Sequence, residues 1–347
     1  MTADTVGGVW TYALDLADAL APHGVEVQLA TMGRLPDVEQ RAAVERSAVA
    51  GLHESDYALE WENDPWDDVD RAGQWLLELA DALRPDVVHL NGYVHATLSW
   101  PAPVVVAAHS DVLSWWRAVR RTPAPESLAC YRNRVAVGLR NANAVCAPTQ
   151  AGLDDLAASY VFETQCEVVP NGRAPRATAF VAKEQLVAGL GRFWDEGKNV
   201  AALQRIAVRS PWPVLLAGPG SALGRISSAE TASLLARASI FVSPARYEPF
   251  GLAALEAAQA GCALVLGDLA SLREVWGDAA AYASPDDDEA VLAAVRDLCT
   301  NRDRRLDLAA RAERRASRYT PEAMAAGMRA LYTRVLAQTA VATEAVA

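Results

Sequence analysis

The sequence is poor in lysine and in paired cysteines, and it contains no long hydrophobic run. Its five cysteines are scattered without a Cys-x-x-Cys pair, which excludes a disulfide framework and a zinc site of the usual spacing, so we interpret them as core thiols. No stretch approaches the roughly 18 apolar residues of a membrane span, and the first ten residues lack the pattern of a secretory signal. These absences predict a cytoplasmic protein.

Positive charge is scarce in the first half of the chain. Residues 1–170 contain 11 Arg, no Lys and 24 Asp plus Glu, although the net charge of the whole chain is only −11. The strong negative charge of this half argues against a nucleic-acid partner, because binding to nucleic acid depends mainly on neutralising its phosphates. The back half is nearly neutral and would accept a small anion more easily.

The length of 347 residues and a hydrophobic fraction of 52% predict two folded domains. Short apolar runs alternate with helical patterns in both halves, as is typical of α/β proteins with parallel sheets covered by helices on both faces. Helices are expected at 66–83, 127–139 and 321–336. Strands are expected at 25–31, 86–90, 102–109, 143–149, 185–191, 213–220, 239–244 and 262–268. A break rich in Pro, Asn and Gly at 170–175 predicts the boundary, giving domains at 1–170 and 171–318, followed by a helix at 319–347 that could cross back to the first domain.

The stretch ARYEPFGLAALEAAQAG at 245–261 carries two carboxylates, Glu248 and Glu256, around a Pro-Phe-Gly turn. The predicted strand ends just before this stretch, and ligands of doubly wound folds bind outside the carboxyl ends of the strands. The amides of Phe250, Gly251 and Leu252 would open a helix N-terminus suited to an anion. Either carboxylate alone could equally be a solvated surface charge, but the two together favour a site.

Three further segments carry candidate site residues. Arg192 and Lys198 follow a predicted strand in GRFWDEGKN, and Lys198 is one of only two lysines in the chain; such a pair suits a diphosphate, although a surface charge at a helix start is an alternative. Gly7 and Gly8 precede an amphipathic helix and permit close approach of a ligand to the backbone, and Gly218 begins a second glycine-rich strand exit. Neither segment has the G-x-G-x-x-G spacing of a dinucleotide site, which disfavours an oxidoreductase.

The chain resembles the retaining, nucleotide-sugar-dependent glycosyltransferases of family four, which have two facing Rossmann-like domains in the fold called GT-B. The resemblance rests on seven stretches of this sequence and above all on the Glu-x7-Glu spacing of the last. These stretches are GGVWTYALDLADAL, DVVHLNGY, VVVAAHSD, VVPNG, GRFWDEGKN, LLAGPG and EPFGLAALE.

The resemblance implies a role for each matching residue. Glu248 would contact the donor sugar near its reacting carbon, and Glu256 would hold the ribose hydroxyls. Arg192 and Lys198 would clamp the diphosphate, Gly8 would approach the donor phosphates, and His109 would face the donor sugar. A histidine that simply caps a strand end is the alternative for His109.

The implied activity is metal-independent transfer of a hexose from a nucleotide-diphosphate sugar to an acceptor hydroxyl with retention of configuration, in carbohydrate biosynthesis. No cofactor or metal is expected, and the acceptor is not identified. Aromatic side chains stack on sugars or apolar aglycones, and we choose Trp10, Trp115 and Trp116 as acceptor contacts. Three arginines after this pair could receive an anionic acceptor or a membrane surface, but a solvated helix face and at most weak membrane association are expected. The alternatives are a GT-B sugar-nucleotide epimerase or hydrolase and a catalytically inactive GT-B binding subunit.

The sequence departs from the family in three places. Met1 stands only six residues before Gly7, so the first strand is expected to be a stub or incomplete. The segment at 218–230 is shorter than in the family, in the region where the nucleotide base commonly packs. Arg173 replaces the Asp that often follows the Asn-Gly of the boundary motif.

Overall fold

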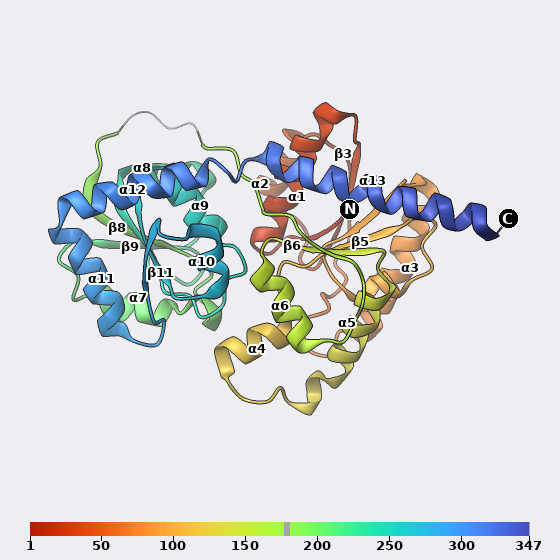
Figure 1. Ribbon diagram of the computed structural model, residues 1–347, viewed down its shortest axis with the longest axis horizontal. Helices are drawn as coiled ribbons and strands as arrows, with labels where there is room; N and C mark the ends of the chain where they lie inside the picture. The colour runs from red at the N-terminus through yellow and green to blue at the C-terminus, as the bar shows by residue number, and fades with distance from the viewer. Residues whose placement is uncertain (177–180, 347) are drawn as a thin grey trace. The chain divides into compact units, whose positions relative to one another are not determined.

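The computed structural model describes residues 1–176 and 181–346 of the chain (Figure 1). The chain folds into two compact units. Unit 1 contains Met1–Trp116, Thr122–Gly172 and the segment from Pro321 onward, and unit 2 contains Arg117–Arg121 and Arg173–Thr320. Each unit has its own parallel strands and its own hydrophobic core.

Unit 1 is built on two short parallel sheets. One has the order β1-β2-β3 and the other β4-β5-β6-β7. The strands are β1 (Thr2–Asp4), β2 (Val27–Met32), β3 (Val49–Glu54), β4 (Val88–Leu90), β5 (Val104–Ala107), β6 (Ala144–Ala147) and β7 (Cys166–Val168). Asn91, just after β4, donates from its backbone N to Thr2 Oγ1 (3.0 Å) and from Nδ2 to Thr2 O (2.7 Å), which fastens the end of β4 to β1. The combined order 3-2-1-4-5-6-7 is that of a doubly wound fold with its switch point between β1 and β4.

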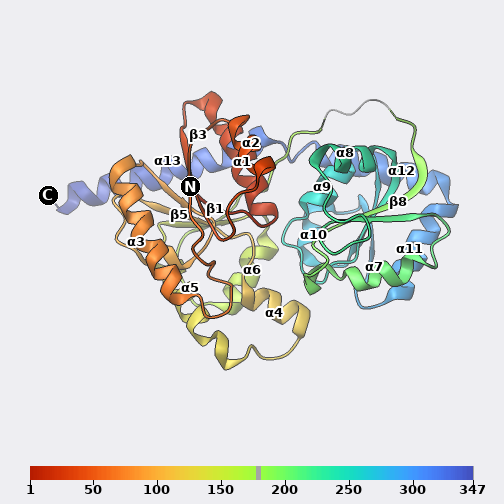
Figure 2. The ribbon, with the colours of Figure 1, turned by 180° about the vertical axis from the view of Figure 1, so that it is seen from behind.

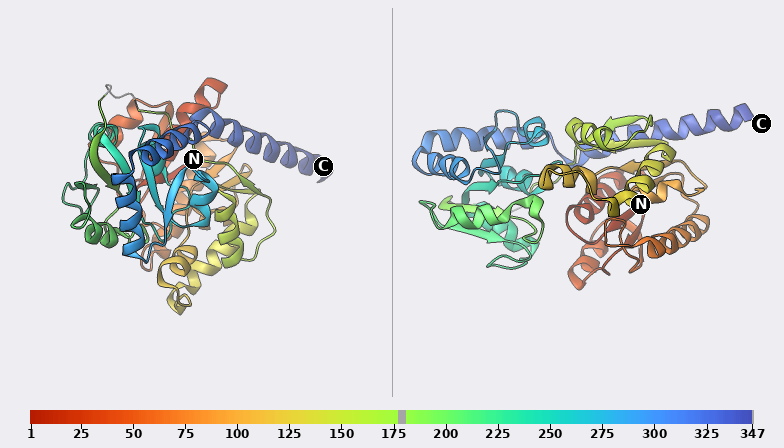
Figure 3. Two further views of the ribbon diagram at one scale, coloured as in Figure 1. Left: turned by 60° about the vertical axis from the view of Figure 1, so that its left-hand side comes forward. Right: turned by 90° about the horizontal axis from the view of Figure 1, so that it is seen from below.

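The α-helices of unit 1 cover both faces of this sheet because apolar residues of its central strands alternate. Val104 and Val106 of β5 face a core made with α3 and α5, whereas Val105 and Ala107 face a core made with α1 and α13. The long α13 packs against α1 and runs along unit 1 to the C-terminus (Figure 2; Figure 3). The helices are α1 (Gly8–Leu20), α2 (Val38–Glu45), α3 (Trp66–Leu83), α5 (Ala129–Asn141), α6 (Gln150–Ser159) and α13 (Pro321–Val346), with 3-10 turns η1 (Ala21–His23), η2 (Val94–Thr97) and η3 (Glu126–Leu128). Helix α4 (Val112–Arg120) begins in unit 1, and its residues from Arg117 onward belong to unit 2.

Unit 2 is one parallel sheet in the order β12-β11-β10-β8-β9. The strands are β8 (Glu184–Leu190), β9 (Val214–Ala217), β10 (Ala238–Ser243), β11 (Ala263–Gly267) and β12 (Ala280–Ala283). The helices are α7 (Val200–Ala207), α8 (Ser228–Arg237), α9 (Leu252–Gln259), α10 (Ala270–Trp276), α11 (Asp288–Thr300) and α12 (Arg302–Ala316), with a 3-10 turn η4 (Glu196–Lys198). β9 pairs with one edge of β8, and the next strand, β10, pairs with the other edge. The strand order therefore reverses at this point, and the switch point lies between β8 and β10.

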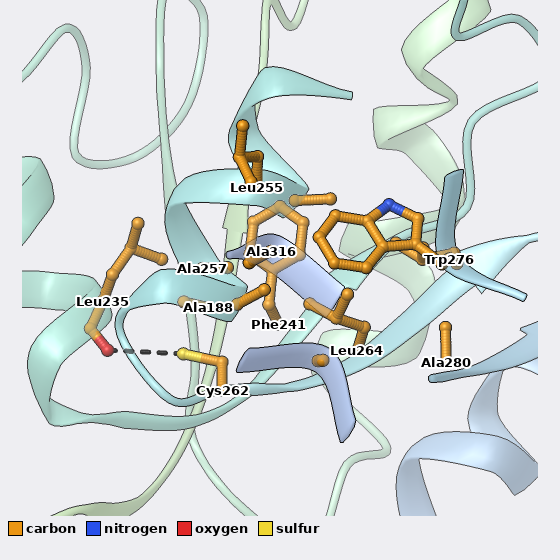
Figure 4. Close-up of a cluster of buried hydrophobic side chains, with 14 of the residues drawn as sticks. Ala188, Leu235, Phe241, Leu255, Ala257, Cys262, Leu264, Trp276, Ala280 and Ala316 are labelled. Atoms are coloured by element: carbon orange, nitrogen blue, oxygen red, sulfur yellow. Dashed lines mark hydrogen bonds between the residues drawn. The ribbon is translucent and has the colours of Figure 1, made fainter. Parts of the chain in front are cut away.

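The core of unit 2 is apolar on both faces of the sheet. Figure 4 shows one face, where Phe241 and Leu264 from the strands meet Leu255 of α9 and Trp276 of α10. Cys262 lies in the same cluster and donates from Sγ to Leu235 O at 3.3 Å. These strands are buried from both sides, which explains why they read as continuous apolar runs in the sequence.

The sequence predicted this α/β class with parallel sheets covered on both faces, and the prediction is confirmed. Its interpretation of all five cysteines as core thiols is wrong in part. All five are free, but only Cys146, Cys262 and Cys299 are buried, whereas Cys130 and Cys166 are exposed. Cys166 belongs to the edge strand β7, where only one neighbour covers the chain. In the described part of the chain, no helix combines the length and the apolar character needed to cross a bilayer.

Candidate functional site

The exits of β8 and β10 flank the switch point of unit 2 and carry three of the predicted site residues. Lys198 follows β8 and Glu248 follows β10, and Lys198 Nζ donates to Glu248 Oε2 at 2.6 Å. Their side chains are 19% and 18% exposed, so the ion pair is mostly covered but still reaches solvent. The structure therefore brings together two residues that are 50 positions apart in the sequence.

The position of Lys198 is fixed by its loop. The carboxylate of Asp195 accepts from Gly197 N at 2.9 Å and caps the 3-10 turn that ends at Lys198. Asn199 then takes a left-handed conformation with φ of 51°, is fully covered, and donates from Nδ2 to Pro244 O (3.0 Å) and Pro285 O (2.5 Å). These bonds attach the Lys198 loop directly to the exit of β10.

Arg192 is held inside the same loop rather than against Glu248. Its Nη2 donates to Asp195 Oδ2 at 2.9 Å, and its guanidinium lies over the Trp194 ring, 5.2 Å from the ring centroid. Asp195 thus pairs with Arg192 and caps the turn that ends at Lys198, whereas the ammonium of Lys198 pairs with Glu248. Trp194 is 59% exposed, and the sequence reasoning did not single it out.

Glu248 stands in the loop before α9, as its position ahead of Pro249 predicted. Its backbone O accepts from Ser271 Oγ at 2.6 Å. Gly251, with φ of 91°, caps the N-terminus of α9, which begins at Leu252. Phe250 is 3% exposed and packs edge-on against Tyr319, so its side chain belongs to the core and only its backbone amide can serve a ligand.

Gly218 lies at the exit of β9 and contacts the exit of β8. A Cβ at this position would stand 1.8 Å from Gly191 O, and its φ of 138° is also unfavourable for other residues. Phe193 N donates to Pro219 O at 2.9 Å, which joins the two strand exits. The glycine thus allows the β9 loop to pass directly beside the Arg192 loop.

Glu256 of α9 is not a solvated helix edge. Its Oε1 forms an ion pair with Arg173 Nε at 2.5 Å, and Arg176 Nη2 lies 3.7 Å away. Gln259 Nε2 donates to Arg173 O at 2.7 Å. Arg173, noted in the sequence only as a departure from the family pattern, is therefore a partner of the predicted ribose-binding carboxylate.

In unit 1, the predicted glycines lie at the exit of β1, beside the switch point of that sheet. Gly7 has φ of 91° and precedes α1, of which Gly8 is the first residue, and both are exposed. Trp10 is only 7% exposed and packs in a core cluster with Ala3 and Leu29. This burial argues against the predicted stacking of Trp10 on an acceptor.

His109 follows β5 and is partly buried. Its Nε2 is 2.8 Å from Asn91 Oδ1, and the Tyr12 ring lies edge-on to it with a centroid separation of 4.4 Å. Burial lowers the pKa of His109 to about 4, so the imidazole is neutral at physiological pH. The sequence reasoning identified His109 but not Asn91, although Asn91 lies in the quoted stretch DVVHLNGY.

Trp115 and Trp116 lie side by side on α4 with a centroid separation of 6.4 Å, and both are partly exposed. Trp116 Nε1 donates to Thr122 Oγ1 at 3.3 Å. Among the predicted acceptor contacts, these two keep accessible ring surface, whereas Trp10 does not.

Glu60 is a titratable group of unit 1 that no sequence pattern indicated. It accepts from Tyr93 N (3.1 Å) and Val94 N (3.1 Å) at the start of η2, and burial raises its pKa to about 7. No group of three His, Cys, Asp or Glu side chains within residues 1–176 and 181–346 is arranged to hold a metal ion.

Two family models match the chain in succession. A model described as Glycosyltransferase Family 4 matches residues 6–175, and one described as Glycosyl transferases group 1 matches residues 221–315. The first range contains His109 and the glycines of unit 1, and the second contains Glu248 and Glu256. Arg192, Lys198 and Gly218 lie between the two matches, so their assignment depends on the geometry described above.

One curated relative is the glycogen synthase of Mycobacterium tuberculosis (strain CDC 1551 / Oshkosh). It is 41% identical over 96 residues, which are 27% of this chain and 22% of that protein. Among solved structures, a sucrose-phosphate synthase from Thermosynechococcus elongatus has a TM-score of 0.79 at 17% identity and covers 97% of this chain and 95% of its own. The Anabaena protein HepE in complex with UDP-glucose has a TM-score of 0.74 at 17% identity, covering 96% and 98%. These structural likenesses establish a two-domain GT-B fold.

Proposed function

Because the chain belongs to the GT-B proteins of glycosyltransferase family 4, we propose that it transfers a sugar from a nucleotide-diphosphate sugar to an acceptor hydroxyl. The observation that supports this most directly is the ion pair of Lys198 and Glu248 at the switch point of unit 2. In doubly wound sheets this is where ligands bind. The N-terminus of α9 begins shortly after Glu248, so backbone amides add to the positive charge of Lys198.

The charges of this site suit both ends of the breaking bond. Cleavage between a sugar and a diphosphate leaves positive charge on the ring and adds negative charge to the leaving group. Lys198 and Arg192 would stabilise the diphosphate, and Glu248 would stabilise the ring as it becomes oxocarbenium-like. In the structure Lys198 and Glu248 form an ion pair. A cation and a carboxylate therefore already lie together at the site before a donor binds.

Glu256 retains the role of holding the ribose in this proposal. A carboxylate offers about four lone-pair sites, so the contact of Oε1 with Arg173 leaves acceptor capacity for ribose hydroxyls. The backbone of Arg173 is itself held to α9 by the hydrogen bond from Gln259.

We further propose that the reaction retains the anomeric configuration and needs no metal. Lys198, Arg192 and the α9 amides together supply the positive charge that a metal would otherwise bring to the diphosphate. The leaving phosphate then takes the proton of the acceptor hydroxyl on the same face of the sugar. The acceptor would contact Trp115 and Trp116.

The first experiment incubates the purified protein with UDP-glucose, chosen because a solved relative carries that donor, and with GDP, ADP and dTDP sugars, across a panel of sugar and lipid-linked alcohols. Lys198→Ala is expected to lower kcat on the order of 10²- to 10³-fold, because it removes a preorganised charge from the leaving group. Arg209→Ala is the matched control, since Arg209 is an exposed cation of the same unit paired with Glu289. Circular dichroism confirms that both variants fold.

Each result decides between the candidate activities. Full transfer activity of Lys198→Ala would contradict the proposed site. Release of free sugar with no acceptor product would indicate a hydrolase, and donor binding without turnover would indicate a binding subunit. Activity that persists in EDTA, and a product with unchanged anomeric configuration by NMR, would support the metal-independent retaining mechanism.

A further inference from the structure

A chain of hydrogen bonds inside unit 1 runs from α13 to His109. Tyr332 Oη lies 2.6 Å from His89 Nδ1, His89 Nε2 lies 3.2 Å from Asn91 Oδ1, and His109 Nε2 lies 2.8 Å from the same Asn91 Oδ1. His89 and Tyr332 are 3% and 8% exposed, so the chain is sealed from solvent at the α13 end. Two imidazoles, from β4 and from the loop after β5, therefore share one amide oxygen, and α13 joins this network through His89.

The orientation of the Asn91 amide is determined by Thr2. Asn91 Nδ2 donates to Thr2 O at 2.7 Å, and a backbone carbonyl can only accept a hydrogen bond. The amide NH₂ group therefore faces β1, and Oδ1 faces the two imidazoles. The backbone N of Asn91 also donates to Thr2 Oγ1, so neither end of the residue can rotate freely.

This orientation assigns the tautomer of both histidines. Because an amide oxygen only accepts, His89 and His109 must each carry a proton on Nε2. Burial lowers the pKa of His89 to about 3 and that of His109 to about 4, so both rings are neutral. The Nδ1 of each ring is then an acceptor, and in His89 it accepts a hydrogen bond from the Tyr332 hydroxyl.

The titratable groups packed around His109 leave it neutral near physiological pH. Tyr12 of α1 packs edge-on to it. Tyr332 of α13 and Cys146 of β6 belong to the same buried cluster as Tyr12, and Tyr332 also contacts the His89 ring. Burial raises the pKa of each of these three groups, so they are uncharged.

We propose that Asn91 is a positioning residue that holds His109 as the Nε2–H tautomer, so that Nδ1 accepts a hydrogen bond from a hydroxyl of the donor sugar. His89 and Tyr332 support Asn91 from the side of α13. The sugar hydroxyl in this inference rests on the proposed function, but the tautomer does not. A ring with one fixed tautomer and one fixed plane presents its lone pair in a single direction, which is how an outer partner orients a histidine that binds a ligand.

The tautomer is tested by ¹⁵N NMR of the five histidines in the full chain without donor, with His109 assigned by His109→Gln. Wild type is expected to show His109 protonated at Nε2 and neutral from pH 6 to 8. Asn91→Ala should give a mixture of tautomers. Asn91→Asp should raise the pKa of His109, because a carboxylate beside an imidazole favours the charged ring. The controls are Asn141→Ala and Asn141→Asp, at an exposed asparagine of α5.

The same variants are assayed for sugar transfer. Asn91→Ala is expected to lower kcat on the order of 10²-fold with the acceptor KM unchanged, because the loss concerns orientation rather than acceptor binding. Asn91→Asp should recover activity at high pH and lose it on the acid side at a higher pH than wild type. Tyr332→Phe, which removes one hydroxyl at nearly constant volume, should lower kcat less and serves if the Asn91 variants do not fold.

The outcomes separate the two proposals. A wild-type His109 protonated at Nδ1, or a tautomer that is the same in wild type and Asn91→Ala, would overturn the positioning role. An unchanged kcat and pH profile in Asn91→Ala, Asn91→Asp and Tyr332→Phe would overturn it as well. A protein that shows the expected tautomers but transfers no sugar would support the positioning role and contradict the proposed function.

Discussion

At the scale of single residues, the two lysines of this chain show how one side chain type serves two purposes. Lys183 Nζ donates to Leu235 O (2.9 Å) and Ala238 O (2.8 Å), so it closes the end of α8 against β10. Lys198 pairs with Glu248 at the proposed donor site. Scarcity of lysine drew attention to both, but only the hydrogen-bond partners distinguish the structural lysine from the proposed catalytic one.

Gly218 provides a residue-scale prediction for stability. Gly218→Ala should lower the free energy of unfolding by roughly 2–4 kcal/mol, because it adds a clash with Gly191 O to the cost of a positive φ. Gly224→Ala is the matched control, since Gly224 also has a positive φ (62°) but a Cβ added there would meet no atom of the described residues within 4 Å. Urea unfolding measures both variants. Equal losses of stability in the two variants would show that the close approach to Gly191 has no energetic weight.

At the scale of secondary-structure elements, η2 depends on a side chain that is distant in the sequence. Glu60 accepts hydrogen bonds from the first N–H groups of η2, which no residue of the turn itself can satisfy. The price of this cap is burial of a carboxylate, and burial raises the pKa of Glu60 from its usual 4.5 to about 7. The element is therefore coupled to pH.

An acid whose pKa is higher in the folded protein binds more protons when folded than when unfolded, so its contribution to stability falls as the pH rises. For Glu60 this contribution is fully present below pH 4.5 and is lost as the pH rises through about 7. Glu60→Gln should therefore be more stable relative to wild type at pH 8 than at pH 5, by an amount on the order of 1–3 kcal/mol. Urea unfolding at the two pH values measures the difference. Glu62→Gln, in the same loop, is the matched control, and a Glu60→Gln effect that is independent of pH would contradict the raised pKa.

At the scale of the whole molecule, Arg173 lies where the chain passes from unit 1 into unit 2, and its backbone N donates to Tyr319 O, close to where the chain passes back. Its side chain is covered and pairs with Glu256. Arg173 thus bonds through its backbone to the segment where the chain leaves unit 2, and through its side chain to the carboxylate that is proposed to bind ribose.

Breaking this pair should destabilise the protein. Arg173→Met leaves the carboxylate of Glu256 without its covered partner and is expected to cost about 3 kcal/mol of unfolding free energy. The double variant Arg173→Met/Glu256→Met should regain most of that loss, because it removes both charges together. Calorimetry and urea unfolding measure the cycle. A double variant that is no more stable than Arg173→Met would show that packing, rather than the charge pair, accounts for the loss.

Much of the fold could be predicted from the sequence, and the failures have local causes. The helix at Trp66–Leu83 has the predicted bounds, and the eight predicted strands that were given ranges form with ends shifted by a few residues. β3 and β12 were missed because their sequences, VAGLHE and AAYA, are short and rich in small or polar residues. Helix and strand patterns depend on burial, and these two edge strands are only partly buried.

The candidate site was predicted less completely. Glu248 and Lys198 were proposed from motif and spacing, and His109 from the family resemblance. The burial of Trp10 was not predicted, because an aromatic residue in the first turn of a helix gives the same sequence pattern whether it faces a core or a ligand. Arg173 pairs with Glu256, Asn91 with His109 and Glu60 with Tyr93, and these partners are 83, 18 and 33 residues apart in the sequence. Such pairings leave no periodic signal in one sequence.

By itself the sequence determined the α/β class, the position of most strands and the loops that follow the carboxyl ends of those strands. It could do so because hydrophobic periodicity and breaks at Gly, Pro and Asn are local properties. Only the tertiary structure decided which of those loops meet. The order of strands places the exits of β8 and β10 next to each other and thereby joins Lys198 to Glu248. It likewise brings β1, β4 and β5 of unit 1 to one asparagine, because hydrogen bonds between strands and side chains depend on distance in space and not on separation along the chain.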